Sequence, residues 1–210
     1  GKRNRTFVWT ARRPIKSKIR LGIVQEFDLI RDYFTWPSCQ SSVILGVGDD
    51  GAICDVESGY QLVTSIDTLI AGVHFPESTS AADIAYKALA VNLSDIAAMG
   101  ALPKYFTLAL TMPEVDKSWL QDFSQSLKQL SEQSGVSLIG GDTTKGSLSI
   151  TISIVGWVES GRALRRSGAQ VGDGVYVSNT IGDAAFALWQ LKNNDNPDNS
   201  CLVKLNRPAP

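Results

Sequence analysis

The chain has very little histidine and cysteine, with one His (His74) and three Cys (Cys39, Cys54 and Cys201) in 210 residues. The cysteines are odd in number and do not have the spacing of a zinc site, so the pattern favours a reduced, cytoplasmic protein. The basic N-terminus is followed by no apolar segment of the kind that a secretory signal needs. No apolar run approaches the length of a membrane span, and we expect no membrane association.

Several common catalytic signatures are also missing. The sequence has no G-x-x-x-x-G-K-[ST] segment, which argues against a P-loop NTPase, and no protein-kinase catalytic loop or Asp-Phe-Gly. A Ser-His-Asp hydrolase is not supported, because there is no nucleophile elbow and His74 has no partner in the sequence.

The charges that are present are unevenly distributed. Eight of the 20 Lys and Arg residues lie in the first 20 positions, where none of the 21 Asp and Glu residues occurs. We interpret residues 1–22 as a disordered basic extension, residues 23–170 as the main domain, and residues 171–210 as the beginning of a second one. The body is acidic and no aromatic and basic platform accompanies the extension, so nucleic-acid binding is not expected.

The segment around which the chain is organised is the glycine-rich turn Gly46-Val47-Gly48-Asp49-Asp50-Gly51. It matches the dinucleotide pattern G-x-G-x-x-G, but two aspartates would repel a pyrophosphate, and no helical pattern follows the third glycine. Paired carboxylates on a tight turn are better suited to a hard cation such as Mg2+. The simple alternative is a surface turn, since Asp-Gly is a common hairpin dipeptide.

Strand and helix patterns alternate along the chain, which is typical of an α/β fold. The longest predicted helix is 80–99, with Ser80 and Asp83 as a capping box and apolar residues on several sides. Asp95 shares an arc with these apolar residues, where a carboxylate costs free energy unless a cation or hydrogen-bond donors meet it. The other predicted helices are 25–34, one that Asp116 caps, and 184–191; the predicted strands are 43–45, 61–66, 105–110, 136–139, 148–154 and 175–177.

Acidic residues stand at the ends of these elements or among apolar residues in four separate segments. They are Asp49 with Asp50, Asp67, Asp95 and Asp142. Each alone is more simply explained as a turn, a cap or a backbone-bonded residue. Taken together they predict one site, because loops at strand ends converge on one edge of an α/β sheet. Clustered carboxylates need counter-cations, and bound Mg2+ usually accompanies a phosphate substrate.

Five motifs in family order give the sequence a resemblance to the thiamine-monophosphate kinase family, over roughly residues 26–191. These are the acidic turn 46–52, Ser65–Phe75, the helix Ala85–Ala101, Leu138–Thr144 and Gly161–Ala169. The resemblance implies Mg2+-dependent transfer of the γ-phosphoryl group of ATP to thiamine monophosphate, giving thiamine diphosphate and ADP. It also implies the aminoimidazole ribonucleotide synthetase-like fold, with a mixed sheet flanked by helices. In that fold the N-terminal domains of a homodimer pair into a β-barrel, near which nucleotide and metals lie.

The same resemblance assigns roles to individual residues. Several Mg2+ ions would be held by Asp50, Ser65, Ile66, Asp67, Asp95 and Asp142. His74 would contact thiamine monophosphate, Gly141 and Asp142 would meet ATP, and Arg166 would contact its phosphates. We expect Asp95 and Asp142 to be the most critical for catalysis, since a phosphate nucleophile is already ionised and needs no strong base.

Two departures from the family leave alternatives open. Ile66 stands where the family usually has Thr, so that a backbone carbonyl would replace a hydroxyl as ligand. The family also continues beyond Pro210 into a second domain that supplies further contacts. The alternatives are another ATP-dependent synthetase of the superfamily, and a non-catalytic half domain that binds nucleotide and Mg2+.

Overall fold

The fold is taken from a computed structural model that describes residues 26–193 and 195–210. The predicted basic extension lies outside the described residues. The main element is a four-stranded mixed sheet in the order β3-β6-β4-β5. Its strands are β3 (Tyr60–Ile70), β4 (Leu102–Met112), β5 (Ser137–Lys145) and β6 (Ser149–Glu159). Only β4 and β5 pair in parallel, so the sheet is mixed, as the resemblance implied.

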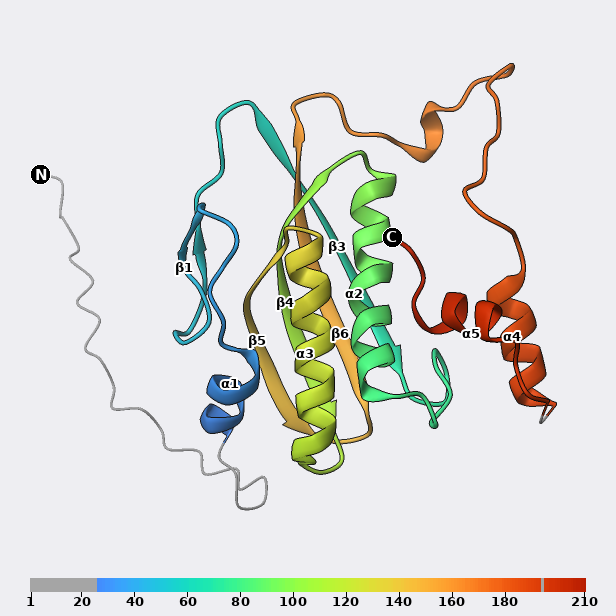
Figure 1. The fold of residues 1–210 in the computed structure, drawn as a ribbon. Coiled ribbons are helices and arrows are strands. Elements are labelled where there is room, and N and C mark those ends of the chain that lie inside the picture. Colours follow the sequence, from blue (N-terminus) through green and yellow to red (C-terminus); the bar gives the residue numbers. More distant parts are fainter. Residues whose placement is uncertain (1–25, 194) are drawn as a thin grey trace, which may run out of the picture.

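Helices cover one face of this sheet (Figure 1). Helix α2 (Ala81–Ala98) packs on β3 and β6, and α3 (Lys117–Gln133) lies beside α2. Short α1 (Glu26–Phe34) contacts α3 and β5 through Phe34, whose ring meets Phe123 edge-on at 6.3 Å. No described helix packs on the opposite face. That face carries the β3 side chains that alternate with the helix-facing ones: Leu62, Ile66 and Ile70.

Both long helices begin where the sequence predicted. Ser80 Oγ accepts a hydrogen bond from the Asp83 amide at 3.2 Å. Asp116 Oδ1 accepts from the Ser118 and Trp119 amides at 2.8 and 3.2 Å. Caps of this kind satisfy amides that a helix leaves free at its first turn, and each contributes about 1 kcal/mol.

All four strands of the main sheet are longer than the sequence pattern predicted. β3 runs on through Asp67 and Thr68, and β5 runs on through Gly140–Thr144. These segments contain Asp67 and Gly140–Asp142, and both Gly and Asp are depleted in strands. Pairing with β6 and β4 over their whole length overrides that preference.

The C-terminal part contains α4 (Asp183–Lys192) and α5 (Asn199–Asn206), which pack on each other. Arg207 joins this pair to α2, because its Nε lies 2.6 Å from Asp83 Oδ1 and its guanidinium stands over the Tyr86 ring. The predicted strand 175–177 is wrong: these residues are exposed and pair with no strand in the described chain. A strand forms only against a partner, which sequence periodicity cannot supply. None of the described helices combines the length and apolar character needed to cross a membrane.

Gly156 sets how closely α2 approaches the sheet. A Cβ at this position would lie 2.8 Å from Ile96 Cγ2 and 2.9 Å from the Leu102 carbonyl oxygen. Both neighbours belong to packed elements, and Ile96 is fully buried. The absence of a side chain here lets the C-terminal half of α2 lie directly on β6.

We expect Gly156→Ala to lower the free energy of unfolding by about 1–3 kcal/mol, because an added methyl overpacks this contact. Thermal or urea unfolding followed by circular dichroism measures the change. Gly168→Ala is the matched control, since a Cβ there meets nothing within 4 Å. Equal stability of the two variants would contradict this role of Gly156.

Candidate functional site

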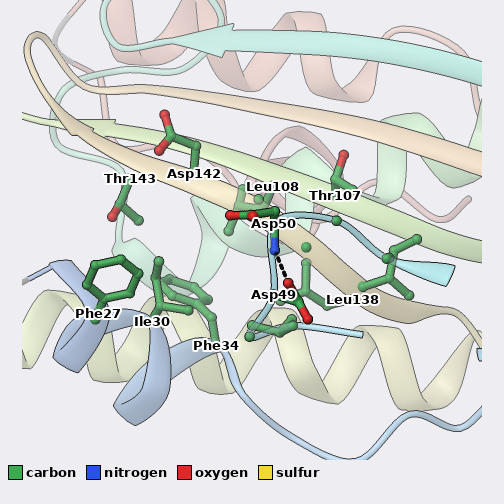
Figure 2. A pocket seen from close by; sticks show the side chains of 17 residues that line it. Phe27, Ile30, Phe34, Asp49, Asp50, Thr107, Leu108, Leu138, Asp142 and Thr143 are labelled. Carbon is green, nitrogen blue, oxygen red and sulfur yellow. Dashed lines mark hydrogen bonds between the residues drawn. The ribbon is translucent and has the colours of Figure 1, made fainter. Parts of the chain in front are cut away.

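A pocket of about 670 Å3 opens along the free edge of β5. Its walls are α1, the acidic turn 47–52 and the strands β4 and β5, as Figure 2 shows. We call it the β5-edge pocket. It is lined by Phe27, Ile30, Phe34, Val47, Gly48, Asp49, Asp50, Gly51, Ala52, Thr107, Leu108, Leu138, Ile139, Gly140, Gly141, Asp142 and Thr143. One wall is therefore apolar and aromatic, and the other is acidic and rich in glycine.

The acidic turn is carried by a small hairpin, β1 (Val43–Leu45) with β2 (Ile53–Cys54), that lies beside the main sheet. Tyr105 of β4 fixes the hairpin, since its hydroxyl bonds Ser42 Oγ at 2.5 Å and the Asp55 carbonyl at 3.3 Å. Burial raises the pKa of Tyr105, so the phenol stays protonated and can donate near neutral pH. The turn is thereby held against the strands that form the far wall of the pocket.

Gly141 lets β5 approach β4 at the base of the pocket. A Cβ on Gly141 would lie 2.0 Å from the Leu108 carbonyl oxygen, a distance that no side chain can occupy. Just before it the register slips by one residue, so that Ile139 is left without a partner on β4. Such bulges re-aim the side chains that follow them. Asp142, the next residue, is exposed at the pocket.

Three carboxylates line this pocket: Asp49, Asp50 and Asp142. The Asp49 side chain is used to close the turn, because its Oδ1 accepts the Asp50 amide at 2.8 Å. Neither Asp50 nor Asp142 makes an ion pair within the described residues. Both remain available to a cation, and both are predicted metal ligands.

Thr143 adds a buried hydroxyl to the pocket lining, on the opposite face of β5 from the Asp142 side chain. Its side chain is 6% exposed and its Oγ1 has no hydrogen-bond partner in the part of the chain that the structure describes. A buried hydroxyl without a partner costs about 1–3 kcal/mol, so its position on the pocket suits a polar ligand atom. Sequence reasoning did not single out Thr143.

A second group of predicted residues lies on the other edge of the sheet, between β3 and α2. We call it the β3–α2 seam and define it by the predicted residues Ser65, Asp67, His74 and Asp95, together with Lys87, which the sequence analysis did not predict. Ser65 Oγ donates to Asp95 Oδ2 at 2.6 Å. Asp67 points to the same side of β3 as Ser65, because residues two apart share a face of a strand. Ile66 points to the open face, where its side chain is 64% exposed.

Asp95 is exposed, which corrects the expectation that it sits among buried residues of the helix. It stands in the last turn of α2, which has no basic residue. The carbonyl end of a helix repels a carboxylate, typically by about 0.3–1 kcal/mol. A cation beside Asp95 would offset both this repulsion and the charge of Asp67.

His74 lies in the tight loop that follows β3. Its Nδ1 accepts the Ile70 amide at 3.0 Å. In the neutral imidazole the proton is therefore on Nε2, which can donate to a ligand. Arg166, in the exposed turn η1 (Arg166–Gly168), does not line the β5-edge pocket. It follows Leu164, whose amide donates to the Met99 carbonyl just beyond the C-terminal end of α2.

The predicted site residues are thus divided between two edges of one sheet. β6 and β4 lie between β3 and β5, so the two edges are three strand spacings apart, about 14 Å. Within the described residues no group of three or more His, Cys, Asp or Glu is placed to hold a metal ion. The prediction that all four acidic segments meet at one edge is therefore wrong for a single chain, because it assumed parallel neighbouring strands.

Each edge nevertheless has a donor set that fits Mg2+. This ion usually takes one or two carboxylates and fills its other positions with water and substrate phosphates. The pocket offers Asp50 and Asp142, and the seam offers Asp67, Asp95 and the Ser65 hydroxyl. All are oxygen donors, and none of these carboxylates is neutralised by a Lys or Arg in the described chain.

The sequence also missed the apolar wall of the pocket. Phe27, Ile30 and Phe34 have helical spacing, which predicts one buried stripe. Phe34 is buried, but Phe27 is 81% exposed. Only the position of α1 at the edge of the sheet turns the outer part of that stripe toward the pocket. The sequence feature that could have indicated this wall is Phe27, an aromatic residue near the start of a short amphipathic helix.

We expect Asp142→Asn to weaken binding of Mn2+, a probe for Mg2+, by about tenfold or more, because a charged ligand contact is worth about 1.5–3 kcal/mol. Electron paramagnetic resonance measures the concentration of unbound Mn2+ in the titration. Asp122→Asn is the control, since Asp122 is exposed on α3 and does not line the β5-edge pocket. Unchanged Mn2+ affinity in Asp142→Asn would remove Asp142 from the ligand set.

Comparison with known proteins identifies a family and several similar proteins. The family described as AIR synthase related protein, N-terminal domain, matches residues 48–158. The thiamine-monophosphate kinase of Haemophilus influenzae is 52% identical over 167 residues, which cover 79% of this chain and 51% of that protein. The chain therefore spans about half the length of this relative.

Two solved structures give the same result in three dimensions. The thiamine-monophosphate kinase of Stenotrophomonas maltophilia superposes with a TM-score of 0.76 at 44% identity, covering 81% of this chain and 57% of the other. A structure described as AaThiL complexed with AMPPCP and TMP gives a TM-score of 0.68 at 30% identity, covering 74% and 52%.

Proposed function

Because the chain belongs to the family of AIR synthase related proteins, we propose that it forms the magnesium- and nucleotide-binding half of a cytoplasmic thiamine-monophosphate kinase. The observation that carries the proposal is the set of unpaired carboxylates at the β5-edge pocket and the β3–α2 seam. Relatives that are about half identical to this chain are named for this activity. A related structure is described as a complex with AMPPCP, an ATP analogue, and TMP.

The proposed reaction moves one phosphoryl group between two anions. An oxygen of the thiamine monophosphate phosphate attacks the γ-phosphorus of ATP, and the bond from that phosphorus to the β-phosphate oxygen breaks. The products are thiamine diphosphate and ADP. The attacking oxygen is already ionised near neutral pH, so the protein has mainly to position the reactants and stabilise charge. This agrees with sites rich in Asp and a chain with a single His.

At the β5-edge pocket we assign the residues to nucleotide binding. Phe27 and Ile30 offer an apolar wall suited to a nucleobase, and Gly140 and Gly141, which have no side chains, leave room for the ligand beside β5. The Thr143 hydroxyl, which has no hydrogen-bond partner within the described residues, would donate a hydrogen bond to the nucleotide. Asp50 and Asp142 would hold Mg2+, which when bound offsets the negative charge of the phosphates.

At the β3–α2 seam we assign the residues to the acceptor side. Ser65, Asp67, Asp95 and the Ile66 carbonyl would hold further Mg2+. His74 Nε2 would donate to thiamine monophosphate, and Arg166, which follows Leu164 beyond the C-terminal end of α2, would contact phosphate oxygens. The Ser65 hydroxyl already fixes the Asp95 carboxylate in place at 2.6 Å.

We further propose that two copies of the chain bring the two edges together. A four-stranded sheet with one open face can close with its twofold mate into an eight-stranded barrel. With the twofold axis along the barrel, the β3 edge of one protomer meets the β5 edge of its partner. Asp67 and Asp95 of one copy would then lie near the partner's Asp50 and Asp142. Exposed Leu62, Ile66 and Ile70 on the open face support this pairing.

We expect Ile66→Glu to shift the protein toward monomer, with a dissociation constant at least about tenfold higher, because a charge on a buried apolar interface must be desolvated. Sedimentation velocity measures the assembly. Ile44→Glu is the control, because Ile44 is 62% exposed against 64% for Ile66 but lies on the small hairpin. Dimerisation of Ile66→Glu at wild-type strength would show that the open face is not the interface.

The direct test of the proposed function uses ATP labelled at the γ-phosphate, Mg2+ and thiamine monophosphate. We expect the label in thiamine diphosphate and lower turnover in Asp95→Asn by about a hundredfold or more, consistent with loss of electrostatic stabilisation. Binding of thiamine monophosphate and Mg-AMPPCP without turnover would support the non-catalytic half domain. Transfer of label to another acceptor, or binding of neither ligand, would overturn the proposal.

A further inference from the structure

Lys87 is a half-buried lysine on α2 that the proposed roles leave unused. Its Nζ donates to the backbone carbonyl of His74 at 3.1 Å. No carboxylate in the described chain lies within ion-pair distance of it. An ammonium can donate three hydrogen bonds, and within residues 26–193 and 195–210 it makes only this one.

The loop that Lys87 contacts is short and closely tied. The Gly72 amide donates to the Phe75 carbonyl, and the His74 amide to the Ile70 carbonyl, both at 2.9 Å. Phe75 is 3% exposed and anchors the end of the loop in the core. With the bond from the Ile70 amide to Nδ1, the backbone and ring of His74 are held by β3. Lys87 provides the tie to α2, the other wall of the seam.

The charge of Lys87 needs an explanation of its own. Burial lowers the pKa of Lys87, which means that the surroundings disfavour the ammonium. A loop tie alone needs only a neutral donor, which would avoid this cost. A cation held without a carboxylate is suited to an anion that arrives from solution.

We propose that Lys87 is the positioning residue for His74, and that it holds the Nε2–H of His74 toward the phosphate ester of the acceptor. The positive charge of Lys87 also favours binding of that anion. The inference rests on the proposed function, because it takes thiamine monophosphate as the ligand of the seam. Lys87 acts through the His74 carbonyl and belongs to the acceptor side, so it serves thiamine monophosphate and not the nucleotide in the β5-edge pocket.

The single histidine makes the test unambiguous. In two-dimensional 1H–15N spectra of the imidazole, every signal belongs to His74. Thiamine monophosphate is titrated into the wild-type chain with Mg2+, and Mg-AMPPCP is titrated separately. In Lys87→Met, which keeps the stem and loses the charge and donors, we expect the dissociation constant for thiamine monophosphate to rise about tenfold or more. That for Mg-AMPPCP should stay within about twofold, because the two ligands bind on different edges.

The matched control is Lys104→Met, which removes another half-buried lysine, one that stands over the Trp157 ring. It should change neither affinity. Lys87→Arg keeps charge and donors and should recover most of the lost affinity. If Lys87→Met does not fold, Lys87→Gln takes its place. Equal weakening of both ligands would show a merely structural role and overturn the inference.

Failure of the inference and failure of the proposed function look different. If thiamine monophosphate does not perturb the His74 signals of the wild-type chain, the proposed acceptor site is wrong and the inference falls with it. If it does, and Lys87→Met binds it within twofold of wild type, only the positioning role of Lys87 is wrong.

Discussion

The packing of α2 on β3 and β6 is the contact on which the rest of the structure depends. It supplies much of the core, and the missing side chain of Gly156 sets how close the helix lies. It also runs α2 along β3, which brings Asp95 to Ser65 at one end and Lys87 to the His74 loop at the other. The seam thus has an acidic end at Asp95 and a basic end at Lys87. The acidic end suits metal ions or an organic cation, and the basic end suits a phosphate group.

The opposite edge of the sheet is built by a different constraint. β5 must approach β4 so closely that only glycine fits at Gly141, and the bulge before it presents Asp142 to the pocket. A small hairpin held by Tyr105 brings the acidic turn to the same place. Because β6 and β4 separate the two edges, one chain holds two separate sets of the proposed cation ligands. The proposed pairing of two open faces would bring the two sets together across two protomers.

Local patterns were sufficient to predict α2, α3, β6 and both long-helix caps, since periodicity and capping depend on nearby residues. They were not sufficient for β5, whose Gly-Gly-Asp-Thr-Thr segment is a strand only because β4 pairs with it. Local patterns do not predict the order of strands in a sheet either. The four acidic segments that include Asp50, Asp67, Asp95 and Asp142 were therefore expected at one edge. Thr143 and Lys87 were missed because a buried hydroxyl without a partner, or a lysine without a carboxylate, can be recognised only in three dimensions.

The central claim is that carboxylates from the two edges form one site across two protomers, and subunit mixing tests it most directly. Asp95→Asn and Asp142→Asn chains are purified separately, mixed, allowed to exchange, and assayed for Mg-AMPPCP binding and thiamine diphosphate formation. Random exchange makes half the dimers mixed, each with one intact site, so the account predicts recovery of about a quarter of the wild-type sites. If the mixture binds Mg-AMPPCP and forms thiamine diphosphate no better than the average of the two separate variants, the account is contradicted.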